Sequence, residues 1–145
     1  MRFTIRTNIN KSYKLVFQHF NLELFKALKP PFMPLEVSQF DGSKTGDLVK
    51  LKVGPLKQDW VSEIVEDFEN EHEIGFIDVG TTLPAPFKQW RHCHRIININ
   101  ENHCVISDEI EYHSSNYLLD IILLLPMYLQ FLSRVPQYKK FFAKK

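Results

Sequence analysis

The chain opens with a regular alternation of apolar and polar positions. Between residues 3 and 9 the apolar side chains recur at a spacing of two, with arginine and asparagine among the residues between them. This period predicts a β-strand with one buried face. The spacing then becomes helical over residues 13–28, with Asn10 or Ser12 as a candidate N-cap. We expect two short helices there, broken near Asn21, and a pair of prolines directly afterwards ends the segment.

From residue 35 to residue 112 the period is mostly two. The alternation predicts six further strands, separated by turn residues such as glycine, proline and asparagine. We expect these strands at residues 35–40, 47–53, 58–68, 73–79, 88–99 and 103–112. The last two form a hairpin, and we place its loop at residues 100–102.

The C-terminal segment returns to helical spacing. Residues 117–142 carry apolar side chains on nearly every turn, and Pro126 and Pro136 are expected kinks. The most apolar part, residues 117–132, is shorter than a membrane span requires and contains Asp120. We therefore interpret it as part of a buried helix.

This order of elements predicts an α+β domain. A curved antiparallel sheet of about seven strands needs its apolar face covered, and the long C-terminal helix is the element large enough to do it. A sheet that curves around one helix leaves a space between them. We expect an internal apolar cavity at that place. On this helix, the residues expected to close the cavity are Leu118, Leu119, Ile122, Leu125, Leu129 and Leu132.

Composition narrows the classes of protein that fit. The 145 residues suit one domain, residues 1–145, and an aromatic share of 13% is enough to fill a core and also line a pocket. A formal net charge of +1, with both signs interspersed, argues against a nucleic-acid partner. Cys93 and Cys104 lie near opposite ends of the hairpin and are not expected to pair. Together with an N-terminus that does not resemble a signal peptide, they lead us to expect a cytoplasmic protein.

The last hairpin carries the candidate chemistry. With its loop at residues 100–102, the pairs on one face are Trp90 with Tyr112, His92 with Ile110, His94 with Asp108 and Ile96 with Ile106. On the other face Arg91 meets Glu111, and Arg95 lies diagonal to Glu109. Opposite charges and aromatic pairs across strands favour this register. A slip of one residue would exchange the two faces.

The polar patch of this inner face has four interpretations. Its members are His92, His94, Asp108 and, from the preceding strand, Asp78. They can orient the polar end of a hydrophobic ligand. They can be structural, with His94 bonded to Asp108 and His92 to a loop carbonyl. His-x-His with Asp108 or Asp78 also permits a metal, and a His94–Asp108 pair permits general-base catalysis. We favour ligand recognition and predict no metal and no cofactor.

Three segments resemble a known superfamily. They are Phe76-Ile77-Asp78, the stretch APFKQWRHCHRI at residues 85–96, and DEIEY at residues 108–112. They are similar to the motifs of uncharacterised bacterial ligand-binding members of the START/Bet v 1-like (SRPBCC) superfamily, which read F-x-D, G-P-F-x-x-W-x-H-x-H-x-F and D-x-V-x-Y. Ala85 and Ile96 depart from that pattern. The resemblance implies a helix-grip fold, in a superfamily that contains binders, carriers and enzymes.

The sequence therefore predicts a protein that binds or carries a hydrophobic or amphipathic small molecule, such as a lipid, isoprenoid or polyketide-like compound. The predicted ligand-binding residues are Trp60, Phe76, Asp78, Trp90, His92, His94, Asp108, Ile110, Tyr112 and Leu125. One alternative is a cyclase or dehydratase that uses His94 and Asp108. The other alternative is a protein-interaction module. A monomer and a homodimer are both consistent with the sequence.

The C-terminal tail offers a further candidate contact. Phe141 and Phe142 stand among four lysines, Lys139, Lys140, Lys144 and Lys145. Such a segment can touch an anionic membrane surface. A solvated, frayed terminus is the interpretation that we favour.

Overall fold

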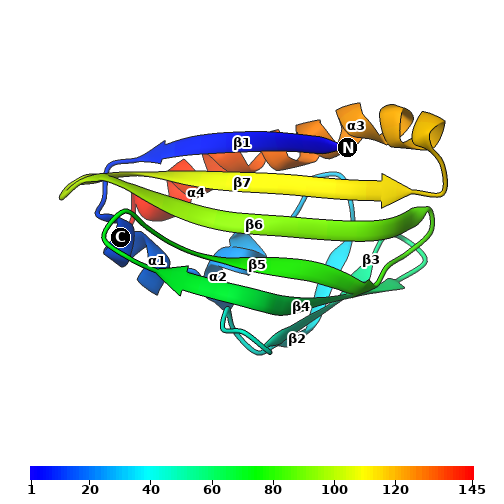
Figure 1. The fold of residues 1–145 in the computed structure, drawn as a ribbon, viewed down its shortest axis with the longest axis horizontal. Helices are drawn as coiled ribbons and strands as arrows, with labels where there is room; N and C mark the ends of the chain where they lie inside the picture. The colour runs from blue at the N-terminus through cyan, green and yellow to red at the C-terminus, as the bar shows by residue number, and fades with distance from the viewer.

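The main body of the protein is one antiparallel sheet of seven strands, in a computed structural model that describes residues 1–145. The strand order across the sheet is β1-β7-β6-β5-β4-β3-β2 (Figure 1). The strands are β1 (Arg2–Ile9), β2 (Leu35–Phe40), β3 (Leu48–Val53), β4 (Gln58–Glu69), β5 (Glu73–Thr82), β6 (Phe87–Asn100) and β7 (His103–Ser114). All seven predicted strands are present, and β5 extends three residues into the segment that was expected to be a loop.

Two short helices follow β1, as the sequence predicts. They are α1 (Tyr13–Gln18) and α2 (Leu22–Ala27). The Ser12 hydroxyl accepts a hydrogen bond from the Leu15 amide at 3.3 Å, and the Asn21 side chain accepts one from the Leu24 amide at 3.2 Å. Each cap satisfies a backbone donor that the first helical turn leaves free. The second cap explains why the chain restarts a helix at Asn21.

Two helices end the chain, α3 (Tyr117–Leu132) and α4 (Arg134–Phe142). The division between them falls at Ser133, not at either proline. Pro126 lies inside α3, while Pro136 lies in the first turn of α4, where a missing amide donor costs little. Helix α4 continues to Phe142, whose side chain is buried. The expectation of a frayed terminus is therefore wrong as far as Phe142.

The register of the β6–β7 hairpin is the predicted one. Trp90 pairs with Tyr112, and His94 with Asp108. The turn itself is tighter than expected, because Asn100 pairs with His103 and an irregularity near residue 99 restores the predicted register along the strands. On the outer face, the Arg95 Nε lies 3.4 Å from a carboxylate oxygen of Glu109. Cys93 and Cys104 are both buried and free.

The inner face of the sheet holds two apolar clusters. One packs α1, α2 and α4 against the turn end of the β6–β7 hairpin, with Val16, Leu24, Ile106, Tyr138 and Phe142 among its members. The other packs α3 against β1, β6 and β7 at the opposite end. Its buried members are Ile5, Trp90, Ile110, Tyr112, Met127 and Phe131. The helices therefore cover the β1–β7–β6 side of the sheet.

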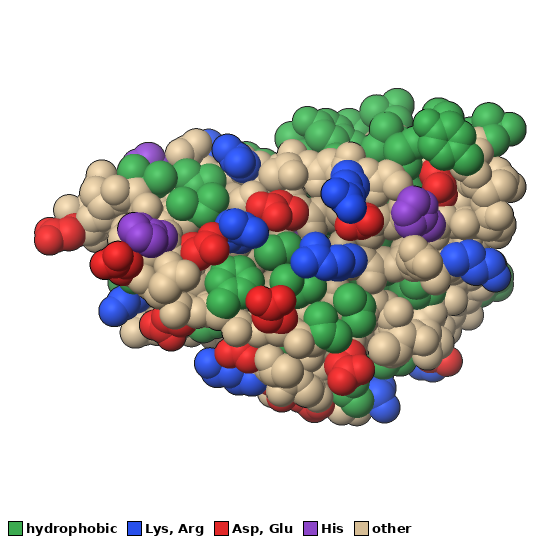
Figure 2. Space-filling view, in the orientation of Figure 1, with side chains coloured by type: hydrophobic (Ala, Val, Ile, Leu, Met, Phe, Trp, Pro, Cys, Tyr) green, Lys and Arg blue, Asp and Glu red, His purple; other side chains and the backbone are tan.

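Helix α3 is not the buried helix that the sequence predicts. Its buried residues are Asp120, Met127 and Phe131. Its exposed apolar side chains are Tyr117, Leu118, Ile121, Ile122, Leu125, Tyr128, Leu129 and Leu132, which we call the α3 stripe. They account for the apolar ridge along the upper edge of Figure 2. The reason is position: α3 packs against β7 and β1, at the edge of the sheet, so only one side of the helix is covered (Figure 1).

Of the six leucine and isoleucine side chains expected to close a cavity, five belong to the α3 stripe, and Leu119 is half-buried. The helical segment from Tyr117 to Phe142 is, by length and composition, long and apolar enough to cross a membrane, and 17% of its most apolar part is buried in the protein. Helix α3 alone has 16 residues, which is shorter than a membrane span requires, as the sequence predicts.

Asp120 has a structural role in α3. One oxygen of its carboxylate accepts a hydrogen bond from the Ser114 amide at 2.5 Å, and its backbone carbonyl accepts one from the Tyr112 hydroxyl at 2.7 Å. The bonds from Ser114 hold the pKa of Asp120 below its usual value. A charged residue in this apolar helix therefore fastens the first turn of α3 to the end of β7.

Two hollows of the structure lie away from the place where the sequence predicts an apolar cavity. One hollow, of about 450 Å³, lies among Arg2, Thr4, Arg91, Glu109 and Glu111, on the charged outer side of β1, β7 and β6. Another, of about 410 Å³, lies between α2 and α4 and is lined by lysines and Glu23. Neither lies between α3 and the sheet.

Gly75 marks a close approach between strands and gives a test of the sheet geometry. A Cβ atom at this position would lie 2.2 Å from the backbone carbonyl oxygen of His94 and 2.7 Å from the ring of Phe68. Because a backbone oxygen cannot move aside, we expect Gly75→Ala to lower the free energy of unfolding by about 3 kcal/mol or more. Urea unfolding followed by circular dichroism measures it. The exposed Val65→Ala is the control and should stay within about 0.5 kcal/mol of wild type.

Candidate functional site

Four ionisable side chains meet on the inner face of three neighbouring strands. Asp78 comes from β5, His92 and His94 from β6, and Asp108 from β7. In the sheet, Asp78 is paired with His92, and His94 with Asp108. Because residues two apart on a strand point to the same side, the register alone brings all four together. We call them the inner-face quartet.

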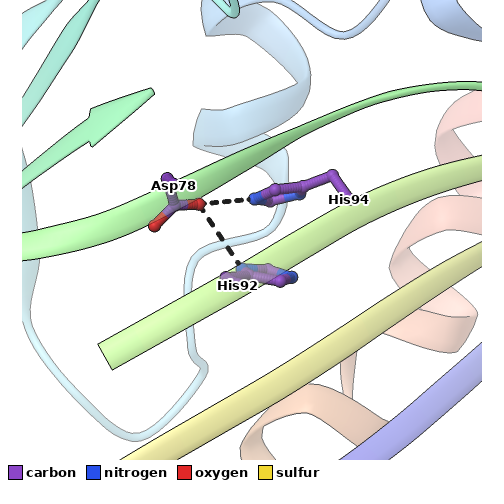
Figure 3. Close-up of side chains that lie close together, drawn as sticks. All are labelled: Asp78, His92 and His94. Atoms are coloured by element: carbon purple, nitrogen blue, oxygen red, sulfur yellow. Dashed lines mark hydrogen bonds and ion pairs between the residues drawn. The ribbon is translucent and has the colours of Figure 1, made fainter. Parts of the chain in front are cut away.

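The hydrogen bonds of the quartet run diagonally between strands. His92 Nε2 lies 2.9 Å from Asp108 Oδ1, and His94 Nε2 lies 2.8 Å from Asp78 Oδ2 (Figure 3 draws the Asp78 side). The directly facing pairs are longer, at 3.8 Å for His94 Nδ1 to Asp108 Oδ1 and for His92 Nδ1 to Asp78 Oδ2. The structural interpretation, which bonded His94 to Asp108 and His92 to a loop carbonyl, is wrong in both partners.

Aromatic rings hold the two imidazoles in place. Their ring centroids are 3.6 Å apart, and Phe76 stacks on His94 with centroids 4.3 Å apart and planes 17° from parallel. On the other side, Phe131 of α3 contacts His92 edge-on at 5.2 Å. Held between these rings, each imidazole directs one nitrogen toward Asp78 and the other toward Asp108.

Helix α4 completes the surroundings of Asp108. The Tyr138 hydroxyl lies 3.5 Å from Asp108 Oδ1, and an Arg134 nitrogen lies 3.9 Å from the same oxygen. The second oxygen, Oδ2, is buried and has no hydrogen-bond partner. The sequence interpretation missed Arg134 and Tyr138. The signal in the sequence is their spacing of four, which puts both polar groups on one face of a helix.

Burial and pairing set the charges of the quartet. Burial alone would raise the pKa of Asp108, but the hydrogen bond from His92 and the charges around it lower that pKa to about 2. Burial lowers the pKa of His92 to about 4, so its ring is neutral at neutral pH. For Asp78, burial alone would raise the pKa, but the hydrogen bonds from His94 and Ser62 and the charges of the two imidazoles together hold that pKa below its usual value. The quartet therefore keeps two ionised carboxylates inside the protein.

Nine of the ten predicted ligand-binding residues lie on this inner face. Besides the quartet they are Trp60, Phe76, Trp90, Ile110 and Tyr112, and of these five only Trp60 is not fully buried. The Trp60 and Trp90 rings meet edge-to-face, with centroids 4.9 Å apart. Trp60 also donates a hydrogen bond to the Ser62 hydroxyl at 3.0 Å. Leu125 is the exception, because it is 64% exposed on the outward side of α3.

An apolar surface adjoins the quartet on the β2–β4 side of the sheet. The pairings Val37 with Leu51 and Leu51 with Trp60 put these residues on the same face as Asp78. Val37, Val49, Val53 and Trp60 are only half-buried. The two apolar clusters beneath the helices draw their buried members from the other strands. The inner face therefore presents a part-exposed apolar surface next to a buried charged group.

Three members of the quartet have the donor atoms of a metal site. Asp78, His92 and His94 each offer one ligand atom, and these atoms lie within 4.8 Å of one another. Side-chain exposures of 12%, 4% and 13% respectively show that two of the three reach solvent slightly. Imidazole and carboxylate are the ligands that zinc and other first-row divalent ions bind.

Comparison with known proteins shows which solved structures share the fold of this chain. Neither a family model nor a curated protein matches the chain. Among solved structures, norcoclaurine synthase from Thalictrum flavum, solved in complex with dopamine and hydroxybenzaldehyde, is similar with a TM-score of 0.71 at 14% identity, over 99% of this chain and 87% of that chain. An uncharacterised protein from Bacillus thuringiensis has a TM-score of 0.67 at 13% identity, over 99% of both chains.

These likenesses confirm the predicted fold, a Bet v 1-like helix-grip fold with a seven-stranded antiparallel sheet and a long C-terminal helix. A protein from Mycobacterium smegmatis has the same likeness, with a TM-score of 0.67 at 17% identity over 99% of this chain and 91% of that one. Identities this low concern the fold alone. The neighbours include an enzyme, norcoclaurine synthase, but a shared fold does not assign its function to this chain.

Proposed function

We propose that the protein binds a hydrophobic small molecule on its inner face. The apolar body of the ligand lies on the surface formed by β2, β3 and β4, and its polar end approaches Asp78 and His94. The observation that carries this proposal is the part-exposed apolar surface of β2, β3 and β4, on the same face of the sheet as the quartet. A mostly apolar site with a few polar groups at one end is how proteins orient amphipathic molecules.

Several features support this arrangement. Asp78 and His94 are the members of the quartet with the most accessible side chains, at 12% and 13% exposure. His92 and Asp108 lie deeper, at 4% and 1%, and hold the accessible pair in position. The enzyme hypothesis required a His94–Asp108 pair. In the structure His94 bonds to Asp78 at 2.8 Å and lies 3.8 Å from Asp108, so ligand binding is the function that the geometry supports better.

Tryptophan fluorescence offers a local test of ligand binding. Both tryptophans of the chain, Trp60 and Trp90, lie on the inner face, so a brominated long-chain alcohol bound there should quench them with a saturable curve. Val37→Arg puts a charge on the half-buried apolar surface. We expect it to weaken the apparent affinity about tenfold or more, because an apolar contact worth about 1.5–3 kcal/mol is lost.

The matched control is Val79→Arg. Val79 is also half-buried in a strand, but it pairs with Glu63 and Arg91, outside the inner face. In Val79→Arg the brominated alcohol should quench the tryptophan fluorescence as it does in the wild-type protein. Equal quenching in the two variants, or wild-type quenching that never saturates, would contradict the proposal.

A second candidate function concerns the outside of α3. We infer that the α3 stripe lies on an anionic membrane surface, where the protein would take up or release its ligand. The eight exposed side chains recur at spacings of three and four, so they form one continuous stripe. Contiguous exposed apolar side chains of this kind mark protein or membrane interaction sites.

The charge next to the stripe favours a lipid surface. Ser133 keeps right-handed helical backbone angles (φ −63°, ψ −19°), so the helical rotation continues into α4. Lys139 and Lys140 follow Leu132 by seven and eight positions, which returns them to the face of the stripe, and both are exposed. An apolar helical face next to lysines is what anionic bilayers attract.

A further inference from the structure

We propose that Asp78, His92 and His94 form a binding site for a divalent transition-metal ion, for which zinc is the reference. This goes beyond the proposed ligand binding and does not depend on it. The three donors come from two adjacent, hydrogen-bonded strands, and a single oxygen of Asp78 faces a nitrogen of each imidazole (Figure 3). Two histidines and one carboxylate that leave further positions open are a recurrent metal-binding set.

The distances are close to those that a metal needs. Around a zinc ion with bonds of about 2.0–2.2 Å, ligand atoms stand roughly 3–3.5 Å apart. Asp78 Oδ2 lies 2.8 Å from His94 Nε2 and 3.8 Å from His92 Nδ1, which brackets that range. The two imidazole rings lie 3.6 Å apart with their planes 31° from parallel, so the side chains must rotate to bring a nitrogen of each toward one ion.

Asp108 supplies the outer-shell partner that metal-bound histidines usually have. His92 directs Nδ1 toward Asp78, while its other nitrogen, Nε2, lies 2.9 Å from Asp108 Oδ1. A carboxylate in this place fixes which imidazole nitrogen carries the proton and which one is free to bind the metal. Asp108 is in turn positioned by Tyr138 and Arg134.

The charge of Asp78 gives an independent reason. Its ion-pair partners within 4 Å are His92 and His94, with no lysine or arginine among them. A buried carboxylate requires compensation by a positive charge or by hydrogen bonds. Hydrogen bonds from His94 and Ser62 supply part of this compensation, and a divalent ion bound between Asp78 and the two imidazoles would add the positive charge.

Titration with Zn²⁺ by calorimetry tests the site, on protein first stripped with a chelator. We expect one ion per chain. His94→Gln and Asp78→Asn should each weaken binding by more than the roughly 10–100-fold that loss of an outer-shell partner costs. The control is His72→Gln, since His72 is 83% exposed and outside the quartet, and it should bind as wild type does.

A second measurement needs no variant and so does not depend on whether the substituted proteins fold. In ¹⁵N NMR of wild-type imidazoles, Zn²⁺ should shift Nδ1 of His92 and Nε2 of His94, and should leave the rings of His72 and His103 unchanged. Absence of stoichiometric binding by the wild-type protein would overturn the proposal. So would shifts confined to the exposed histidines, which would identify adventitious surface binding.

Discussion

His92→Ala is expected to lower the free energy of unfolding by about 3–5 kcal/mol, because it leaves the buried Asp108 carboxylate without its closest hydrogen-bond partner. The His92 and Asp108 side chains are 4% and 1% exposed, and Asp108 Oδ2 already lacks a partner. Without His92, the remaining oxygen of Asp108 would retain only the longer approaches of Tyr138, His94 and Arg134. Urea unfolding in the presence of a chelator measures the change without a contribution from bound metal.

The control for this prediction is an ion pair on the surface. Arg2 and Glu111 pair at 3.2 Å across β1 and β7, with side-chain exposures of 79% and 31%. Because water screens such a pair, Arg2→Ala should change the free energy of unfolding by less than about 1 kcal/mol. If His92→Ala costs no more than Arg2→Ala, the quartet is not the tightly coupled unit that its geometry indicates.

Ile122→Ser combined with Leu125→Ser is expected to reduce binding to anionic lipid vesicles at least about tenfold. Each apolar side chain contributes roughly 1.5–3 kcal/mol when it moves from water into an apolar phase. The two residues are 60% and 64% exposed, so the substitutions do not remove core contacts. Co-sedimentation with vesicles that contain phosphatidylglycerol measures the effect, and vesicles of phosphatidylcholine alone should bind less because the lysines then have no anionic partner.

The matched control for α3 is Leu56→Ser. Leu56 is 83% exposed, but it lies in the turn between β3 and β4, outside the α3 stripe. It should leave vesicle binding unchanged. Sedimentation velocity without lipid separates the membrane from a second copy of the chain. A dimer that the double variant dissociates, together with no vesicle binding by the wild type, would make the stripe a dimer interface and contradict the membrane proposal.

The fold was largely predictable because its signals are local. Alternation at a spacing of two identified all seven strands, and charges such as Arg91 and Glu111 fixed the register of the last hairpin. That register was sufficient to place Asp78, His92, His94 and Asp108 on one face. It was not sufficient to pair them, because side-chain rotation decides between the facing and the diagonal partner, and spacing carries no information on rotation.

The helix could not be placed from its sequence for a different reason. A helix that is apolar on nearly all sides is compatible with burial in a core and with contact to lipid. What decides the exposure of Leu118 or Leu125 is that α3 lies along the β1 edge of the sheet, which is a property of the tertiary structure. The same placement determines that α4, through Arg134 and Tyr138, reaches Asp108, some 26 and 30 residues away in the sequence.

The most direct test of ligand binding on the inner face is native mass spectrometry of freshly purified protein, compared with its denatured mass. We predict a stoichiometric organic adduct that is lost on denaturation, present in Val79→Arg and strongly reduced in Val37→Arg. A bound metal ion would be recognised separately by its small mass. A wild-type protein that carries no organic adduct, and acquires none when incubated with the brominated alcohol, would contradict the account.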